Sequence, residues 1–297
     1  MITIREVKTE RDRRIFSDFP NRLYKDVPQY MPPLSADDRG DWNPKKNPAF
    51  AYCDVKAFLA EKDGKVVGRV GAILNHRANE KWHTNRMRFS QLDFIDDPEV
   101  SDALFKAVED FAREKGCDSV HGPLGFTDLD REGMLVEGFD QKSMFITYYN
   151  YPYYIQHLER LGYAKDVDWV EFLIDVPKDP RLIDRLGKLS ERVLAHNRLH
   201  VAEIKRRRDF QPYVEKVFRL WNTAYAPLYG TTTLDDTQVK RYVKKFLPMI
   251  DPRLACFVMD EQDELVAFGV SAPSIASALK KSNGRLFPFG FVGVLRA

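Results

Sequence analysis

Two distant segments of the chain carry nearly the same alternation of apolar and polar residues. They are residues 57–68 and residues 256–267. In the first segment Asp63-Gly64 separates two apolar runs, which is a strong signal for a β-hairpin. The likeness of the two segments predicts an internal repeat of one supersecondary plan, with chance similarity of two amphipathic hairpins as the alternative.

The residues around the first hairpin predict a mixed α/β arrangement. Alternation predicts strands, and apolar residues at helical spacing predict amphipathic helices. A strand, a helix and a strand in succession form a parallel crossover unit. The expected elements are a strand at Ile2–Val7, a helix at Thr9–Tyr24, a proline-rich ordered loop at 27–48, strands at Val55–Ala60, Val66–Leu74 and Arg88–Phe94, a helix at Pro98–Lys115, a strand at Cys117–His121, a helix at Tyr153–Leu161 and a strand at Trp169–Ile174.

A connecting helix at Leu182–His196 follows, and then the pattern restarts. The second copy is expected to contain a strand at His200–Ile204, helices at Phe210–Tyr225 and Thr237–Leu247, and a hairpin at 255–271. We therefore predict a first module at residues 1–176, a linker helix at 177–199, and the first half of a second module at 200–297, which we expect to be truncated.

Composition describes an ordinary folded chain. Of its 297 residues, 44% are hydrophobic and the net charge is +2, so disorder and a surface built to coat a polyanion are both disfavoured. The three cysteines, Cys53, Cys117 and Cys256, form no C-x-x-C pair and are expected to be reduced core residues. The start of the chain lacks the pattern of a signal peptide, and no apolar run is long enough to span a bilayer. We expect a cytoplasmic protein without a membrane partner.

The predicted order of elements resembles the GCN5-related acyl-CoA N-acyltransferase superfamily. Three segments carry the likeness, namely the hairpin at 63–68, the strand–helix unit at 89–115, and the run Tyr151–Tyr163, which ends in leucine, glycine and an aromatic residue. More narrowly, the chain resembles bacterial proteins with two such modules in tandem. The resemblance implies a mixed twisted sheet with flanking helices, acetyl-CoA or another acyl-CoA as donor, and a small-molecule amine or peptide as acceptor.

Two positions depart from the pattern that the resemblance implies. The donor diphosphate would be held by a glycine-rich turn at a helix start. In this chain the turn is Ile95–Val100, which has no glycine, contains Pro98, and carries three carboxylates that repel a diphosphate. The tyrosine acid of the superfamily falls on Leu158, which cannot donate a proton. The residues that would bind the donor are therefore unknown from the sequence.

The segment 122–142 is the best candidate for a site, because long segments without periodicity are often functional. It leaves the carboxyl end of a strand, where open α/β sheets bind ligands. We predict Glu137 as a general base, provided that partial burial raises its pKa. We predict Thr127, Asp128 and Asp130 as substrate-binding residues. The alternative is a solvated loop whose carboxylates cap turns.

A cluster of tyrosines follows this segment. Tyr149 is predicted as the second catalytic residue, and Asn150, Tyr153 and Tyr154 as substrate-binding residues, because tyrosine combines apolar area with a hydroxyl. Core packing is the alternative. His76, Glu80 and His83 match no metal-ligand spacing, so no metal is expected.

Two main functions remain open from the sequence. One is acyl-CoA-dependent N-acyl transfer to an amine. The other is a non-catalytic protein of the same fold that binds a ligand or partner. A third reading, transfer from aminoacyl-tRNA as in other tandem-module transferases, is disfavoured by the modest charge and the single compact basic run, Lys205–Arg208. No nucleic-acid partner is expected, and the oligomeric state cannot be read from the sequence.

Overall fold

The chain divides into two compact units. A computed structural model describes residues 1–144 and 146–295. The first unit contains Met1–Asp168, Gly230–Thr232 and Ser274–Ala297, and the second contains Trp169–Tyr229 and Thr233–Pro273. Arg296 and Ala297, the last residues of the expected second module, lie outside the described residues. The module boundaries at 176 and 199 stay a prediction.

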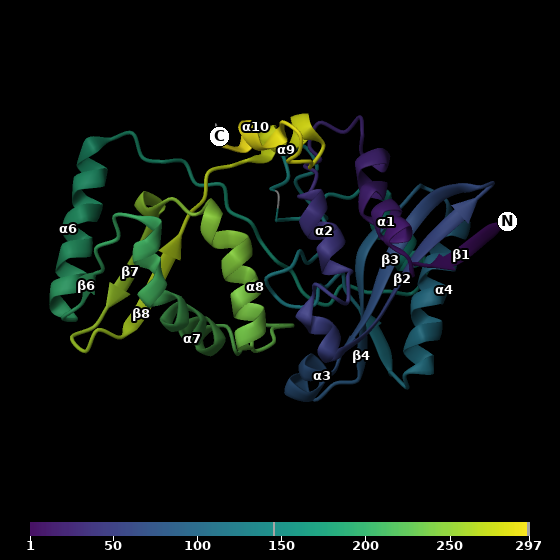
Figure 1. The fold of residues 1–297 in the computed structure, drawn as a ribbon, viewed down its shortest axis with the longest axis horizontal. Coiled ribbons are helices and arrows are strands. Elements are labelled where there is room, and N and C mark those ends of the chain that lie inside the picture. The colour runs from purple at the N-terminus through teal and green to yellow at the C-terminus, as the bar shows by residue number, and fades with distance from the viewer. Residues whose placement is uncertain (145, 296–297) are drawn as a thin grey trace. The chain divides into compact units, whose positions relative to one another are not determined.

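The first unit is built on a five-stranded mixed sheet (Figure 1). Neighbouring strands in this sheet are antiparallel except β4 and β5, which run parallel and are connected through a helix. Asp63 and Gly64 both take positive φ, 51° and 73°, as a two-residue turn between right-twisted strands requires. In sheet order, the strands are β1 (Ile2–Glu6), β2 (Cys53–Lys62), β3 (Lys65–Asn75), β4 (Arg86–Phe94) and β5 (Ser119–His121).

Helices α4 (Pro98–Glu114) and α5 (Tyr153–Arg160) cover one face of this sheet. Asp97 caps α4 by accepting a hydrogen bond from the Glu99 amide at 3.0 Å, and Pro98 occupies the first turn, where its missing N–H costs no helical bond. The predicted helix is therefore confirmed. Its apolar face, together with Tyr154 and Leu158 of α5, forms the larger core.

Helix α1 (Glu10–Leu23) lies on the opposite face, and α2 (Ser35–Asp41) follows it (Figure 1). Phe16 of α1 and Trp42 pack against the apolar side chains that β2 and β3 turn to this side. The expected loop at 27–48 is ordered but contains α2, and a 3-10 turn (Pro48–Ala51) follows. Helix α3 (His76–Trp82) was not expected either, because a helix of two turns leaves little periodicity to detect.

The prediction of a strand at Trp169–Ile174 is wrong. The segment is in no sheet, and Phe172, Leu173 and Ile174 are each more than 80% exposed. A strand needs a partner edge, and β5 offers three residues before Pro123, which has no N–H to donate. Alternation at 169–174 therefore has no ladder to join in this structure.

The second unit contains an antiparallel sheet ordered β6-β7-β8, the same order and pairing as β1-β2-β3. Asp263 takes a positive φ of 57° in its hairpin turn, as Asp63 does in the first. The predicted repeat is thus seen in these three strands, although β6 is shorter than expected. Cys256 of β7 is exposed, so it is not a core residue as expected. The elements are α6 (Pro180–His196), β6 (His200–Val201), a 3-10 helix (Arg207–Tyr213), α7 (Val214–Ala224), α8 (Asp236–Phe246), 3-10 turns at Leu247–Met249 and Pro252–Leu254, β7 (Ala255–Met259) and β8 (Leu265–Val270).

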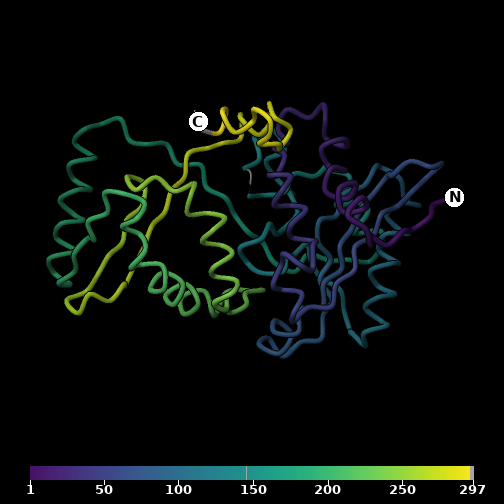
Figure 2. Tube along the Cα trace, in the orientation of Figure 1, coloured from purple at the N-terminus to yellow at the C-terminus, as the bar shows by residue number. Residues whose placement is uncertain are grey.

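The last described segment returns to the first unit. It contains α9 (Ala276–Ser282) and α10 (Gly290–Leu295), and Figure 2 shows this yellow trace beside the chain that follows α1. The Ser35 amide donates to the Gly284 carbonyl at 2.9 Å. A Cβ at Gly284 would lie 2.1 Å from the Pro33 carbonyl oxygen, so this approach requires glycine.

The fold class predicted from the sequence, a mixed sheet with flanking helices, is confirmed. The order of strands, the crossover through α4 and the closing helix α5 are those that the acyltransferase resemblance implies. None of the described helices has the length and apolar character needed to cross a membrane.

We expect Gly71→Ala to destabilise the protein by about 1–3 kcal/mol, because overpacking a filled core forces neighbours to move. A Cβ at Gly71 would lie 1.9 Å from the Trp42 ring. Gly40→Ala, in α2 where no atom lies within 4 Å, is the control and should leave stability unchanged or raise it by up to about 1 kcal/mol. Urea denaturation measures both, and equal midpoints for the two variants would contradict the packing argument.

Candidate functional site

An extra residue in β4 determines which side chains face α1 and α2. The pairing of β3 with β4 shifts between Arg69 and Gly71, opposite Asp93 and Ser90, and Gln91 has a positive φ of 46°. In a regular strand residues 88 and 93 would face opposite sides. The bulge changes the phase, so Arg88, Gln91 and Asp93 share the face of α1 and α2.

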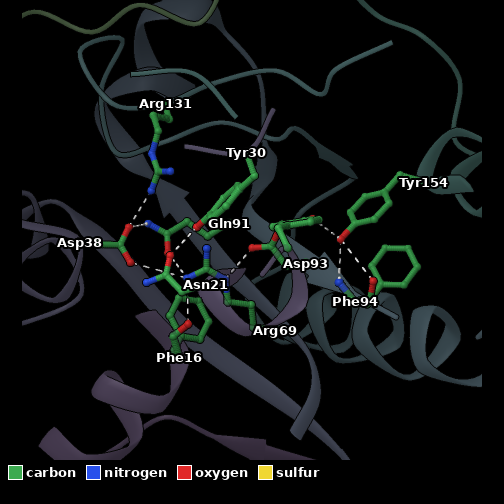
Figure 3. A network of polar contacts seen from close by, with 11 residues as sticks. Phe16, Asn21, Tyr30, Asp38, Arg69, Gln91, Asp93, Phe94, Arg131 and Tyr154 are labelled. Carbon is green, nitrogen blue, oxygen red and sulfur yellow. Dashed lines mark hydrogen bonds and ion pairs between the residues drawn. The ribbon is translucent and has the colours of Figure 1, made fainter. Parts of the chain in front are cut away.

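Arg69 is the centre of a buried polar network on this face (Figure 3). Its side chain is 1% exposed. Nε donates to Asp93 Oδ2 at 2.7 Å, and Nη1 donates to Gln91 Oε1 at 3.0 Å and to the Phe16 carbonyl at 2.9 Å. One guanidinium therefore joins β3, the β4 bulge and α1.

A second arginine continues the network into the long loop. Asp38 of α2 lies 3.6 Å from Arg69 and accepts hydrogen bonds from Gln91 Nε2 at 3.1 Å and from Arg131 Nη2 at 2.7 Å (Figure 3). The Arg131 guanidinium also lies over the Tyr148 ring, 4.7 Å from its centroid. The segment 122–142 is thus bound to α2 by the hydrogen bond between Arg131 and the buried Asp38 carboxylate.

Two tyrosines extend the network in the other direction. Tyr24 donates to Asp93 Oδ1 at 2.8 Å, and the hydroxyls of Tyr24 and Tyr154 are 2.8 Å apart. Since Tyr24 gives its one proton to Asp93, Tyr154 is the donor in their pair. Burial raises the pKa of Asp93, and Arg69 and Tyr24 oppose that shift.

Tyrosine hydroxyls also cover the backbone of Phe94 at the end of β4. The Phe94 amide donates to the Tyr154 hydroxyl at 2.8 Å, and Tyr153 donates to the Phe94 carbonyl at 2.5 Å. Beyond Arg88 and His121, β4 and β5 are no longer paired. Tyr153 and Tyr154 of α5 therefore hydrogen-bond to the Phe94 amide and carbonyl, which β5 does not pair with.

A small pocket lies between the bulge and the long loop. Tyr149, Asn150 and Tyr154, all predicted from the sequence, meet in its wall. Burial raises the pKa of Tyr149, which keeps its hydroxyl protonated at neutral pH. The full lining is Leu92, Pro123, Gly133, Met134, Tyr148, Tyr149, Asn150 and Tyr154.

Asn150 and Asp130 hold the loop in shape. The Asn150 side chain exchanges hydrogen bonds with the Leu135 backbone, at 2.7 Å to the amide and 3.1 Å to the carbonyl. Asp130 Oδ2 accepts from the amides of Phe126 and Thr127 at 2.9 and 3.2 Å. Asp130 therefore caps a turn, as the structural alternative proposed, and a substrate-binding role for it stays a prediction.

The other predicted residues are scattered. Thr127 is fully buried and Asp128 half-buried, and neither is among the residues that line the pocket. Glu137 is exposed, so the partial burial on which its predicted role depended is not found there. Its role as a base stays a prediction without that support.

A different carboxylate in the loop has the properties expected of a base. Burial raises the pKa of Glu132 to about 8, against the opposing charge of Arg88. Asp128 and Asp130 raise it further. Glu132 Oε1 is buried and has no hydrogen-bond partner among the described residues. Glu132 is not predicted from the sequence, because no local signal separates this half-buried glutamate from the exposed Glu137 five residues later.

The start of α4 does not fit a diphosphate. Asp97 caps the helix and pairs with Lys62 at 2.7 Å, while Asp96 pairs with His157 at 2.9 Å. His157 Nδ1 also lies 2.8 Å from Ser101 Oγ. The acidic residues at the helix start are therefore already engaged by Lys62 and His157, and they remain a group of carboxylates that repels a diphosphate, as expected from the sequence. Among the described residues no group of three or more His, Cys, Asp or Glu is placed to hold a metal ion.

No protein-family model matches the chain. Two curated relatives are similar over almost its whole length. Protein YghO of Escherichia coli K12 is 28% identical over 98% of this chain and 73% of its own. A protein named bacterial ceramide synthase, from Caulobacter vibrioides, is 28% identical over 99% of this chain and 76% of its own.

Solved structures that match are acetyltransferases of low sequence identity. A tandem GNAT protein from the clavulanic acid biosynthesis pathway covers 90% of this chain and 73% of its own, with a TM-score of 0.47 and 13% identity. An aminoglycoside acetyltransferase from an uncultured soil metagenomic sample covers 59% of this chain and 97% of its own, with a TM-score of 0.36 and 13% identity. The acyltransferase-like fold therefore rests on this chain's own strand order, which confirms the resemblance at the level of the fold.

Arg69→Met should cost about 3–5 kcal/mol of stability, because it leaves Asp93 and Asp38 as buried charges without their shared partner. The matched control is Arg113→Met on α4, because the Arg113 side chain is 65% exposed and pairs with Glu109 and Asp110 at the surface. That change should cost less than about 1 kcal/mol. Chemical denaturation compares them, and a loss at Arg69 no larger than at Arg113 would refute the central role of the network.

Glu132→Gln should change the dependence of stability on pH. A carboxyl with a pKa of about 8 when folded and 4.5 when unfolded binds more protons in the native state, so native stability falls as pH rises from 4.5 to 8. Each pKa unit corresponds to about 1.4 kcal/mol. The variant should lose that decline and gain on the parent toward pH 8. Denaturation at pH 5, 6.5 and 8 tests this, with Glu137→Gln, at an exposed position on the same loop, as the matched control. A Glu132→Gln variant that keeps the parent's decline would contradict the prediction.

Proposed function

We propose that the protein is an N-acyltransferase that moves an acyl group from a thioester donor, acetyl-CoA or another acyl-CoA, to an amine. The acceptor is a small-molecule amine or a peptide, and the first unit binds it. The observation that carries the proposal is the small tyrosine-lined pocket at the β4 bulge, beside a loop with a half-buried glutamate whose Oε1 atom is buried.

The chemistry that such a reaction needs is a proton acceptor near the amine. An amine in water near pH 7 is mostly an ammonium ion, and it must lose a proton before it can attack a thioester. Glu132, with a pKa of about 8, is matched to this task, and the next two residues, Gly133 and Met134, line the pocket. In this proposal Glu132 takes the role that the sequence gave to Glu137, and Tyr149 orients the acceptor.

The donor is not assigned to the start of α4, whose acidic residues are already paired. The name of the C. vibrioides relative describes an enzyme that forms a ceramide, which is an amide. At 28% identity this supports the reaction class and no particular substrate. We further propose a cytoplasmic location, and no nucleic-acid partner or aminoacyl-tRNA donor.

A non-catalytic binding protein of the same fold is the second candidate. The specific observation in its favour is that Tyr153 and Tyr154 hydrogen-bond to the Phe94 backbone, and that Asp96 and Asp97 at the start of α4 are paired with His157 and Lys62. A module closed in this way can keep a ligand pocket without binding a donor.

Release of CoA thiol from acetyl-CoA in the presence of a panel of primary amines and peptides tests the proposal. We expect amine-dependent release, reduced about 10²–10⁴-fold by Glu132→Gln, the usual contribution of a general base. Loss of activity in Glu137→Gln instead would return the role to Glu137. Asp140→Asn, at an exposed position on the same loop, is the matched control.

Melting with and without acetyl-CoA separates the two candidates. A bound donor raises the midpoint by mass action. No thiol release with any amine, together with no shift, would overturn the enzyme and favour the binding protein.

A further inference from the structure

Lys280 of α9 extends its amine to the loop that follows α1, where two carbonyl oxygens and an aromatic ring contact it. Lys280 Nζ donates to the carbonyl oxygens of Val27 and Tyr30, the latter at 3.0 Å. It also lies over the Tyr30 ring, 5.6 Å from the centroid. We name these two carbonyls and this ring the ammonium seat.

The seat has the chemistry of a site for a primary ammonium group. Two carbonyl oxygens accept N–H bonds, and an aromatic face attracts a cation. Burial lowers the pKa of Lys280, and the charge of Asp26 opposes this. Asp26 therefore adds a negative field to the seat.

Contacts that do not involve Lys280 fix the seat. The Val27 amide donates to the Tyr24 carbonyl at 3.1 Å. The Tyr30 hydroxyl donates to Asn21 Oδ1 at 2.7 Å, and the Tyr30 ring packs 4.9 Å from that of Tyr24. The two carbonyls should hold their places when the lysine is absent.

The seat adjoins the candidate pocket. The Tyr30 ring is 6.5 Å from the ring of Tyr149, which lines that pocket. The Ser143 amide, in the stretch between the long loop and the tyrosine cluster, donates to the Gln29 carbonyl beside the seat at 3.0 Å. An amine held in the seat would therefore be one aromatic ring away from the proposed acceptor pocket.

We propose that the ammonium seat binds a primary ammonium group of the acceptor other than the amine that is acylated, and that Lys280 fills it as an internal stand-in. The inference rests on the proposed function in that the acceptor is an amine. Lys280 is half-buried and has a flexible stem, so a ligand has to displace one side chain while Leu279, which is fully buried, still anchors α9.

Titration of the full chain with n-butylammonium chloride tests the seat. Lys280→Met removes the internal cation and keeps the apolar stem. If the lysine leaves the seat free about one-tenth of the time, its removal lowers the half-saturating amine concentration about tenfold. Lys281→Met, at an exposed position next to it, should respond as the parent does. The shift of the melting midpoint with amine concentration is the readout.

Two further measurements keep the outcome decisive. n-Butyltrimethylammonium has the charge but no N–H to donate, so it should give no comparable shift. Lys280→Gln keeps N–H donors without the charge, and it should fall between Lys280→Met and the parent in amine response. If Lys280→Met is destabilised, n-butylammonium should restore its midpoint.

An equal response of Lys280→Met and the parent, or an equal effect of the quaternary amine, would overturn the inference. No acyl donor is present in the titration. A positive titration without acyl transfer would therefore contradict only the proposed function. Acyl transfer with a negative titration would contradict only the ammonium seat.

Discussion

The ion pair between Arg69 and Asp93 is the interaction on which the rest of the site depends. Both groups are buried, and each is held by further partners, so that α1, α2, the β4 bulge and the long loop all meet one guanidinium or its neighbours. A buried charge is tolerated when it is paired and fully hydrogen-bonded. Removing Arg69 or Asp93 would leave other buried polar side chains without partners. The arrangement of the long loop therefore depends on this ion pair.

Close to the bulge that creates this polar face, the backbone at the end of β4 bonds to side chains of α5. Strand β4 ends at Phe94, where two tyrosines of α5 hydrogen-bond to the backbone amide and carbonyl. Helix α4 follows, and Asp97 at its start is paired with Lys62. The first unit thus has an acyltransferase-like fold in which side chains of α5 bond to the end of β4. Tyr154 of α5 also lines the pocket, and the long loop beside the pocket carries the half-buried Glu132.

Local signals in the sequence were enough for much of the fold. Asp63-Gly64 predicts its turn because two positive φ angles are needed there, and Asp97-Pro98 predicts the start of α4 because capping involves neighbouring residues. The repeat, the parallel crossover and the clustering of Tyr149, Asn150 and Tyr154 were also predicted from patterns in the sequence, and the mixed sheet from the family resemblance.

Only the tertiary structure decided which residues are buried, paired or left without a partner. The bulge at Gln91 depends on the strand beside it, and the segment at 169–174 is no strand because no edge is offered to it. Burial raises the pKa of Glu132, which lies near Arg88 of β4, whereas Glu137 is exposed. The seat filled by Lys280 joins residues some 250 positions apart. Pattern and capping act over a few residues and can be read from the sequence, whereas desolvation and pairing depend on where the remainder of the chain lies.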